Sequence, residues 1–201
     1  MFISIIRIII TSLLTFFFTG IPTGFLIVKI VTGKDIRKIG SGNIGATNVK
    51  RVLGWKWFIF VLVTDALKGA LPLLVWIFLN FSDFGIYGKI IITIFALCGN
   101  IFSPWLGFKG GKGVATSLGA LTVLLPIPLL CSLGIFGLVL FLSRMISLAS
   151  VVAAISFPFF VLFLKNEMIV FIFSVCVSLL IVLRHSENIK RIFKGDEKKF
   201  F

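Results

Sequence analysis

Charged residues are scarce in this sequence. They make up 13% of its 201 residues, whereas 59% are hydrophobic. Soluble domains carry roughly 25% charged residues. A chain with so few charges has too little polar side-chain surface to face water on all sides, which argues against a soluble globular protein. We therefore predict an integral membrane protein.

Histidine and cysteine are also rare. The only histidine is His185, which excludes a zinc site built on several histidines and a catalytic pair of histidines. The cysteines Cys98, Cys131 and Cys176 lie inside apolar runs without the spacing of metal ligands. We interpret all three as small buried hydrophobic residues. We expect neither a metal nor another cofactor.

Long apolar runs, by contrast, fill most of the chain. A transmembrane helix needs about 20 apolar residues, and helices satisfy all their own backbone hydrogen bonds in lipid. The length leaves room for about seven such helices and no soluble domain. We predict an all-α architecture with a single transmembrane domain over residues 1–201. The predicted spans are approximately Phe2–Ile30, Trp55–Leu79, Gly85–Pro104, Val114–Leu125, Ile127–Ser143, Ile146–Leu164 and Met168–Leu183.

Two proline-containing segments interrupt these runs. Pro126 and Pro128 either kink one long helix or separate two short ones, and the lengths of the flanking runs favour two helices. The segment Gly20–Gly24, which contains Pro22, predicts a kink within the first span. Some of the helices are therefore expected to be short or kinked.

The excess of positive charge predicts the orientation of the chain. Lys and Arg number 20 against 7 Asp and Glu, for a formal net charge of +13, and loops rich in Lys and Arg stay on the cytoplasmic side. With seven spans, only Lys89 and Lys165 fall on one side of the membrane. The other side collects Lys34, Arg37, Lys38, Lys50, Arg51, Lys56, Lys109, Lys112, Arg144, Arg184, Lys190, Arg191, Lys194, Lys198 and Lys199. We therefore predict the amino terminus outside and the carboxyl terminus in the cytoplasm.

Three polar segments fall on the predicted cytoplasmic side: Gly40–Arg51, Gly107–Thr116 and Arg184–Arg191. Closely spaced glycines allow backbone N–H groups to turn toward an oxyanion that Lys and Arg neutralise, and a following helix adds the positive end of its dipole. Alternatively, the glycines form tight turns and the cations bind anionic headgroups. The presence of three such segments on one side favours phosphate handling at the membrane surface.

Nucleotide-binding motifs of soluble proteins do not fit these segments. Gly40–Gly45 has the spacing of a dinucleotide-binding loop, with Asp65 where a ribose-binding acid is expected, but Asp65 lies in an apolar run and no strand precedes the loop. Lys112 is followed by Gly113 rather than Ser or Thr, which excludes a P-loop. We expect Asp65 and Lys68 to form an ion pair inside the helix bundle, with a site-lining role as the alternative.

The polar segments resemble a known family, the acyl-phosphate-dependent glycerol-3-phosphate acyltransferases of bacterial membranes. Asp35–Arg51 resembles the first motif of that family, Phe108–Thr116 its second, and His185–Arg191 with Gly195 and Glu197 its third. Asp65–Gly69 and Arg144–Ser150 are similar to two further stretches. The five matches occur in order and with fitting spacing, which makes the resemblance more specific than any single glycine pattern.

The resemblance implies a seven-helix enzyme that transfers a fatty acyl group from acyl phosphate to the 1-hydroxyl of sn-glycerol 3-phosphate, giving lysophosphatidic acid and phosphate. It implies a bacterial inner membrane location, contact with membrane lipid, no nucleic acid partner, and an enzyme that supplies acyl phosphate as a further partner. By position, the implied catalytic residues are Ser41, Arg51, Lys112, His185 and Asn188. The implied substrate-binding residues are Gly42, Asn43, Gly45, Thr47, Asn48, Lys109, Gly110, Gly111, Gly113 and Glu197.

One position departs from the family pattern. The family has His where this chain has Asn100, within Gly99–Pro104. Asparagine can form hydrogen bonds but cannot accept a proton, which leaves His185 as the only imidazole. Either His185 or a substrate phosphate would then deprotonate the glycerol hydroxyl, and the sequence does not choose between them.

Two other classes of function explain parts of the sequence. A phosphate or organophosphate transporter would account for buried charges and glycine-broken helices, but it predicts polar residues facing both sides and an inverted repeat, and neither is apparent. A lipid-binding structural membrane protein would account for the basic side but not for three separate polar segments. The sequence therefore favours the acyltransferase.

Overall fold

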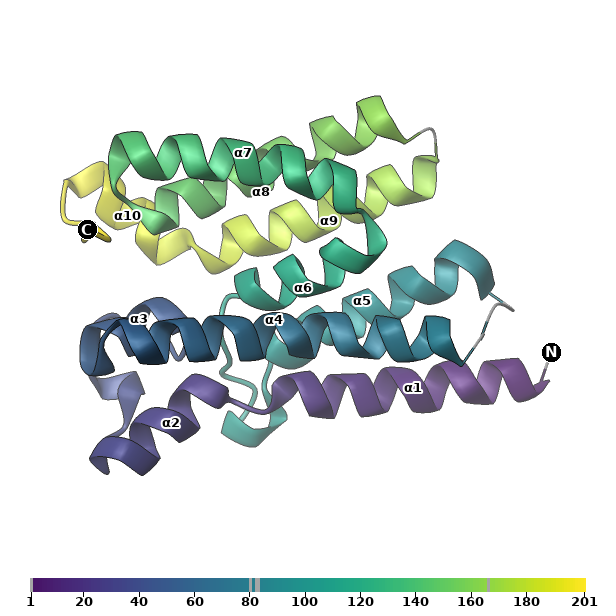
Figure 1. Cartoon of the computed structure of the whole chain (residues 1–201), viewed down its shortest axis with the longest axis horizontal. Coiled ribbons are helices and arrows are strands. Elements are labelled where there is room, and N and C mark those ends of the chain that lie inside the picture. The colour runs from purple at the N-terminus through teal and green to yellow at the C-terminus, as the bar shows by residue number, and fades with distance from the viewer. Residues whose placement is uncertain (1, 80, 82–83, 166) are drawn as a thin grey trace. The chain divides into compact units, whose positions relative to one another are not determined.

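The computed structural model describes residues 2–79, 81, 84–165 and 167–201, and these residues form helices and loops without a strand (Figure 1). The all-α prediction is confirmed for this part of the chain. Short 3-10 helices, η1 (Ile36–Lys38) and η3 (Pro104–Leu106), lie in the loops. The α-helices are α1 (Phe2–Gly20), α2 (Thr23–Thr32), α3 (Ala46–Leu53), α4 (Trp55–Phe78), α5 (Gly85–Ile101), α6 (Val114–Leu124), α7 (Pro126–Ser143), α8 (Ile146–Leu164), α9 (Met168–Arg184) and α10 (Ser186–Lys194).

Both proline segments break helices where the sequence predicts. α1 ends at Gly20 and α2 begins at Thr23, so the first apolar run is a broken helix. α6 ends at Leu124 and α7 begins at Pro126, which confirms two helices instead of one long kinked helix. Proline is tolerated in the first turn of a helix because the N–H that it lacks would have no partner within the helix.

Within the described residues, five helical segments are long and apolar enough to cross a membrane: Phe2–Thr32, Trp55–Phe78, Gly85–Leu106, Pro126–Ser143 and Ile146–Leu164. α9 and α10, which meet at a bend of 57°, make a sixth if they are counted together. α6 has 11 residues, or about 16 Å at 1.5 Å per residue, roughly half of the hydrocarbon core. All seven predicted runs therefore form helices, and α6 is too short to span alone.

Contacts between residues group the chain into two units, Met1–Leu124 and Leu125–Phe201. In the first unit, α1 packs on α5, α4 packs on α5 and α6, and α2 and α3 both contact α4. In the second unit, α8 packs against α7 and α9, and α10 contacts α8 and α9. The first unit contains two of the three polar segments, and the second unit contains the third.

Two glycines allow α4 and α6 to touch through their backbones. A Cβ built on Gly119 would lie 1.7 Å from the Ala66 carbonyl oxygen, and a Cβ on Gly69 would lie 2.0 Å from the Thr116 carbonyl oxygen. Small residues permit this close approach between membrane helices. The contact with α4 fixes where α6 begins, and therefore where the polar residues 107–113 before it lie.

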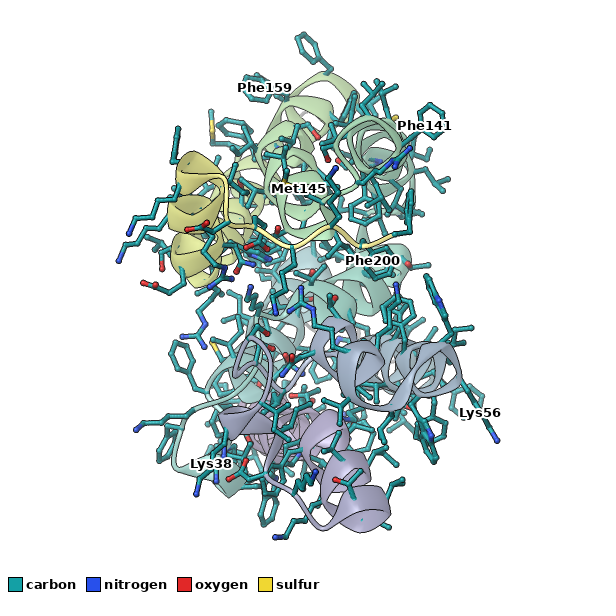
Figure 2. The ribbon with its side chains drawn as sticks, turned by 90° about the vertical axis from the view of Figure 1, so that its left-hand side faces the viewer. Lys38, Lys56, Phe141, Met145, Phe159 and Phe200 are labelled. Carbon is teal, nitrogen blue, oxygen red and sulfur yellow. The ribbon has the colours of Figure 1, made fainter. Side chains whose placement is uncertain are left out.

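Many large apolar side chains point outward, as Phe141 on α7 and Phe159 on α8 do (Figure 2). Such exposure has little cost in lipid, because acyl chains are as apolar as these side chains. The prediction that all three cysteines are buried was wrong for the same reason. Cys98 and Cys131 are half-buried and Cys176 is exposed, because an apolar residue on a membrane helix need not be covered by protein.

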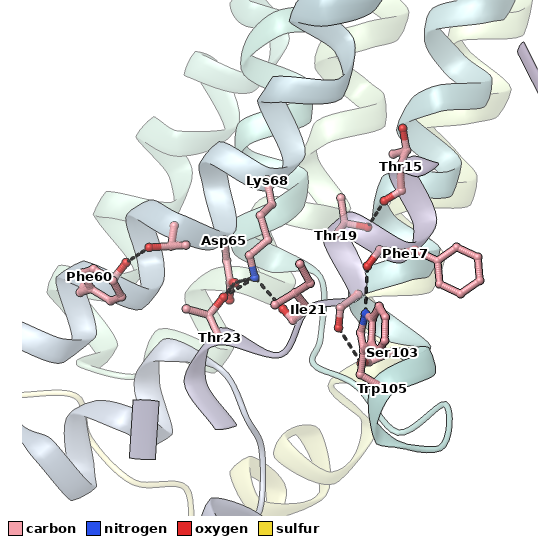
Figure 3. A network of polar contacts seen from close by, with 12 residues as sticks. Thr15, Phe17, Thr19, Ile21, Thr23, Phe60, Asp65, Lys68, Ser103 and Trp105 are labelled. Atoms are coloured by element: carbon pink, nitrogen blue, oxygen red, sulfur yellow. Dashed lines mark hydrogen bonds and ion pairs between the residues drawn. The ribbon is translucent and has the colours of Figure 1, made fainter. Parts of the chain in front are cut away.

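Asp65 and Lys68 form the predicted ion pair within α4. Lys68 Nζ lies 2.9 Å from Asp65 Oδ1, and both residues are buried. The pair also bonds to the break between α1 and α2 (Figure 3). It therefore joins two elements of the first unit.

Candidate active site

The first polar segment is organised around the side chain of Asn48, which lies in the first turn of α3 and is 1% exposed. Its Oδ1 accepts a hydrogen bond from the Ser41 N–H at 3.0 Å, and its Nδ2 donates to the carbonyl oxygens of Ile39 and Asn43, both at 2.9 Å. One buried side-chain amide thus forms hydrogen bonds with loop backbone groups that lie outside any helix or strand. The family resemblance implied Asn48 as a substrate-binding residue, and nothing in the sequence indicated its role in holding the loop.

Two glycines shape the turn that carries Ser41. Gly40 and Gly42 have φ values of 65° and 70°, which residues with a side chain rarely adopt. A Cβ on Gly40 would also lie 2.2 Å from Asn48 Oδ1. Ser41 is therefore held between two glycines on the exposed part of the loop.

The loop closes on α3, whose last turn carries cations. Asn43 Oδ1 accepts the Gly45 N–H at 2.8 Å, directly before the helix. Lys50 Nζ lies 3.6 Å from the ring centroid of Trp55, and its partial burial, with the charge of Arg51 nearby, lowers the pKa of Lys50. Among the predicted residues of this segment, Ser41 and Arg51 are exposed, Gly42, Asn43, Gly45 and Thr47 are half-buried, and Asn48 is buried.

The second polar segment is bound to the carboxyl end of α5. The N–H groups of Gly110 and Gly111 donate to the carbonyl oxygens of Ile101 and Asn100, at 3.1 and 3.0 Å. Carbonyl groups in the last turn of a helix have no donor within the helix, so these bonds satisfy α5. The prediction that closely spaced glycines direct their N–H groups toward an anion is wrong for this pair. Gly110 instead permits close approach, since a Cβ there would lie 2.1 Å from the Asn100 carbonyl oxygen.

Lys112 and Gly113 lead into α6. Gly113 has a φ of 79°, and its carbonyl oxygen accepts the Ser117 N–H at 2.7 Å as the helix begins. The N–H groups of the first helical turn and the positive end of the helix dipole therefore follow Lys112 directly. Groups of this kind at a helix start suit an anion such as a phosphate group. Lys109 is exposed, Lys112 is half-buried, and Gly111 and Gly113 are buried.

The first two segments meet at Gly111. A Cβ built on Gly111 would lie 3.9 Å from Ile44 Cγ1 and 3.1 Å from Asn100 Oδ1. The side chain of Asn100, the position at which the resemblance implies a histidine, therefore faces the second segment. Within the unit Met1–Leu124, the structure brings the predicted residues of the first and second segments beside each other.

The third polar segment lies in the unit Leu125–Phe201, at the bend between α9 and α10. His185 occupies this corner and is 3% exposed. Its Nδ1 lies 2.8 Å from the Ile181 carbonyl oxygen, which can only accept, so Nδ1 carries the proton of the neutral ring and Nε2 is the basic nitrogen. A histidine held in this tautomer has the chemistry of a general base.

Glu197 joins the third segment to α8. Its Oε1 accepts hydrogen bonds from Ser147 Oγ and Asn188 Nδ2, and its Oε2 accepts from Arg191 Nε, all at 2.7 Å. Burial raises the pKa of the Glu197 carboxyl, but the hydrogen bonds from Ser147, Arg191 and Asn188 and the charge of Arg191 outweigh it, so the pKa lies below its ordinary value of 4.5. The family resemblance implied Glu197 as a substrate-binding residue. In the structure both of its carboxylate oxygens bond to protein side chains.

The residues after α10 fold back on the start of α8. The Phe200 N–H donates to the Arg144 carbonyl oxygen at 2.6 Å, and Figure 2 shows Phe200 passing near Met145. The stretch Arg144–Ser150 thus makes two contacts with the carboxyl-terminal residues: Arg144 bonds to Phe200, and Ser147 bonds to Glu197. Ser147 was not among the predicted site residues, although it lies in the stretch Arg144–Ser150 that is similar to the family.

The chemistry that these segments offer is positive charge, hydrogen bonding and one imidazole. In the part of the chain that the structure describes, no group of three or more His, Cys, Asp or Glu is placed to hold a metal ion. Cations and hydrogen-bond donors are groups that bind anionic substrates, and an imidazole is a group that can transfer a proton at a hydroxyl.

Residues 9–195 match the protein family described as glycerol-3-phosphate acyltransferase. The chain belongs to this acyltransferase family. A glycerol-3-phosphate acyltransferase of Fusobacterium nucleatum is 42% identical over 188 residues, which cover 93% of this chain and 95% of the relative. A glycerol-3-phosphate acyltransferase of Endomicrobium trichonymphae is 41% identical over 199 residues, which cover 99% of this chain and 96% of the relative.

Solved structures of the same family are also similar to this chain. The crystal structure of PlsY (YgiH), an integral membrane glycerol 3-phosphate acyltransferase, in its glycerol 3-phosphate form has a TM-score of 0.89 and 34% identity, covering 97% of this chain and 96% of that chain. The lysophosphatidic acid form of PlsY has a TM-score of 0.84 and 32% identity, covering 96% and 95%. The predictions of the glycerol-3-phosphate acyltransferase family and of an integral membrane architecture are therefore confirmed.

Proposed function

We propose that this chain transfers a fatty acyl group from acyl phosphate to the 1-hydroxyl of sn-glycerol 3-phosphate, giving 1-acyl-glycerol 3-phosphate (lysophosphatidic acid) and phosphate, the first step of phospholipid synthesis. The observation that carries the proposal is the family match over residues 9–195. The forms of PlsY with glycerol 3-phosphate and lysophosphatidic acid support the acceptor and the product. The resemblance of the three motifs to the acyl-phosphate-dependent enzymes supports the donor.

Acyl phosphate is a mixed anhydride, so its acyl carbon is already activated. The glycerol hydroxyl oxygen attacks this carbon, the bond between the carbon and the phosphate oxygen breaks, and phosphate leaves with the electron pair. The hydroxyl proton goes either to Nε2 of His185 or to a substrate phosphate oxygen. No acyl-enzyme is needed, so the task of the protein is to hold two anionic substrates together and to stabilise the developing oxyanion.

Positive charge is the main requirement of this reaction. We assign to Arg51 and Lys112 the neutralisation of the substrate phosphates and of the charge that develops in the transition state. Support comes from the exposure of Arg51 beside the first loop and from the place of Lys112 before α6. Ser41 and Asn188 orient substrate oxygens.

We place the enzyme in the bacterial inner membrane with its active site on the cytoplasmic side, and residues 1–201 act as one transmembrane domain. Lys38 and Lys56 project outward from the first unit (Figure 2), as the positive-inside rule expects of a cytoplasmic surface. A water-soluble acceptor and a lipid-soluble donor both reach such a surface. An enzyme that supplies acyl phosphate is the partner that this reaction requires.

The deciding experiment uses the full chain, purified in detergent, with acyl phosphate and glycerol 3-phosphate. We expect phosphate and lysophosphatidic acid to form together, and only when both substrates are present. Turnover of an acyl thioester without turnover of acyl phosphate would overturn the donor. No lysophosphatidic acid from either donor would overturn the proposed function.

Substitutions of the two assigned cations test the site itself. Arg51→Ala and Lys112→Ala should each reduce kcat/KM by on the order of a hundredfold or more while the helical fold is kept. Lys56→Ala is the matched control, because Lys56 is an exposed cation at the start of α4, outside the three segments. Variants of Arg51 and Lys112 as active as Lys56→Ala would remove both residues from the site. Near-parent activity of His185→Ala would assign the base to a substrate phosphate.

A further inference from the structure

The ion pair of Asp65 and Lys68 lies where charge is costly. α4 runs over 24 residues from Trp55, and the pair lies near the middle, about 15 to 20 Å from the start at 1.5 Å per residue. The side chains of Lys68 and Asp65 are 7% and 12% exposed. A buried pair of this kind adds little stability over apolar residues of similar volume, and ionisable residues inside membrane helices are usually kept for function. The pair therefore needs an explanation beyond stability.

The contacts of the pair lead to the break between α1 and α2 (Figure 3). Lys68 Nζ donates to the Ile21 carbonyl oxygen at 2.6 Å and to the Thr23 hydroxyl. The Thr23 hydroxyl donates in turn to Asp65 Oδ1 at 3.0 Å. Pro22, between these two residues, has no N–H to offer. The Ile21 carbonyl oxygen also accepts the Thr23 N–H at 3.0 Å, so the ammonium adds a second donor at a helix end where lipid offers none.

Two more side chains satisfy carbonyl groups at the end of α1. Ser103 Oγ donates to the Gly20 carbonyl oxygen at 2.6 Å, and Trp105 Nε1 donates to the Phe17 carbonyl oxygen at 3.0 Å. Both donors come from the region of η3, whereas Lys68 comes from α4. The broken helix is therefore bonded on its α1 side to η3 and, at Ile21 and Thr23, to α4.

The start of α2 is in backbone contact with the first polar segment. A Cβ on Gly24 would lie 2.0 Å from the Ile44 carbonyl oxygen and 2.9 Å from Val49 Cγ2. Thr23, which the ion pair holds, is the residue directly before Gly24. A movement of the α2 backbone here cannot be absorbed by a flexible side chain, so it would move the loop that carries Ser41.

We propose that Asp65, Lys68 and Thr23 are positioning residues for the first polar segment. They hold the start of α2 against α4, and through Gly24 they set the place of the loop between η1 and α3 that carries Ser41. None of the three needs to touch a substrate. The proposal rests on the proposed function only in taking this loop to bind substrate.

Threonine variants test the hydroxyl alone. Thr23→Val keeps the shape of the side chain and removes the hydroxyl, and its kcat/KM should fall by about tenfold to a hundredfold, as expected when substrate contacts shift by about 1 Å. Thr23→Ser keeps the hydroxyl and should stay near the parent. Thr93→Val is the control, because it also removes one threonine hydroxyl: Thr23 is half-buried and Thr93 is fully buried, but the Thr93 hydroxyl donates within α5, to the Lys89 carbonyl oxygen. A loss in Thr93→Val as large as in Thr23→Val would overturn the proposal.

A double variant separates positioning from stability. Replacing both members of a buried ion pair by apolar residues is often neutral or stabilising, so Asp65→Leu with Lys68→Met should unfold at or above the temperature of either single variant. If the pair only stabilises the fold, the double variant should recover activity together with stability, relative to the single variants. A positioning pair keeps kcat/KM low in the double variant, because Ile21 and Thr23 have lost the ammonium.

Hydrogen exchange gives a measurement that does not depend on activity. Amides of residues 36–54, among them the Ser41 N–H that bonds to Asn48, should exchange faster in Thr23→Val and in the double variant, while amides of Leu125–Phe201 keep the parent rates. The proposal would be overturned if Thr23→Val and the double variant kept the parent's exchange rates at residues 36–54, or if they kept the parent's kcat/KM. If the parent shows no turnover, the proposed function fails, and the exchange rates alone decide the positioning role.

Discussion

The side-chain amide of Asn188 donates a hydrogen bond to Glu197 Oε1 at 2.7 Å. Asn188 is 7% exposed and Glu197 is 9% exposed, so the bond fixes the orientation of the amide, with Nδ2 toward the carboxylate. This orientation depends on an ionised Glu197, because a carboxylate accepts hydrogen bonds at both oxygens. The contribution of Glu197 to stability is therefore expected to depend on pH.

Glu197→Gln should lower the unfolding temperature most at neutral pH. The pKa of Glu197 is held below its ordinary 4.5, so the ionised carboxylate stabilises the folded protein above that pH, and the contribution is lost as the pH falls through the lower pKa of the folded state. The difference between parent and variant should shrink accordingly below about pH 4.5. Thermal unfolding in detergent from about pH 7 to pH 3 measures it.

The matched control is Glu187→Gln. Glu187 also pairs with a cation, Lys190, at 2.9 Å, but its side chain is 71% exposed. Exposed pairs contribute little, so this substitution should leave the unfolding temperature nearly unchanged at every pH. Equal effects of the two substitutions would contradict the role of burial and of the bonds to Ser147 and Asn188.

Asn48→Ala should both destabilise the first unit and reduce activity. The substitution removes the side-chain partner of the Ser41 N–H and of the Asn43 carbonyl group. It also removes one of two donors to the Ile39 carbonyl oxygen, which also accepts the Gly42 N–H. This loss should lower the free energy of unfolding by about 2–4 kcal/mol. The activity loss should appear in the KM for glycerol 3-phosphate, because the loop loses its fixed shape. Thr122→Ala removes an exposed hydroxyl that bonds within α6 and should change stability by less than about 0.5 kcal/mol. Similar stability of both variants would refute the loop-holding role.

Gly110→Ala should impair the second segment far more than alanine at Gly111. At Gly110 the new Cβ meets the Asn100 carbonyl oxygen at 2.1 Å, a backbone atom, whereas at Gly111 it meets Asn100 Oδ1 at 3.1 Å, the end of a side chain. Initial rates with both substrates, together with the unfolding temperature, measure the effect. Gly134→Ala is the control, because no atom lies within 4 Å of a Cβ there and alanine favours a helix by about 0.5–1 kcal/mol. The reverse order of activity for the Gly110 and Gly111 variants would show that α5 does not hold the loop.

The predicted orientation can be tested with single cysteines. In a variant that lacks Cys98, Cys131 and Cys176, a cysteine next to Lys165 and one next to Lys194 flank the helix α9. An impermeant thiol reagent should label the site near Lys165 from outside intact cells, and the site near Lys194 only after the cells are opened. Labelling of both sites from the same side would contradict the seven-span prediction.

Much of the fold could be predicted from the sequence because its signals are local. Apolar runs of membrane length predict helices, and the segments around Pro22 and Pro126 predict two helix breaks. Pro72 and Pro158, by contrast, lie inside α4 and α8. The spacing of Asp65 and Lys68 likewise predicted their ion pair, because residues three apart share one helix face. The number of spanning helices was less predictable, since the apolar run that forms α6 has only 11 helical residues.

The candidate site was predictable in its residues but not in all their roles. The sequence by itself determined the family, the polar segments and the scarcity of acid and histidine on which the proposed role of the cations rests. Only the tertiary structure decided that Gly110 and Gly111 donate to α5, that Asn48 holds the first loop, and that Glu197 bonds to Ser147. The reason is physical: residue type and periodicity are properties of a short stretch of chain, whereas the partner of a hydrogen bond depends on which distant segments fold against each other.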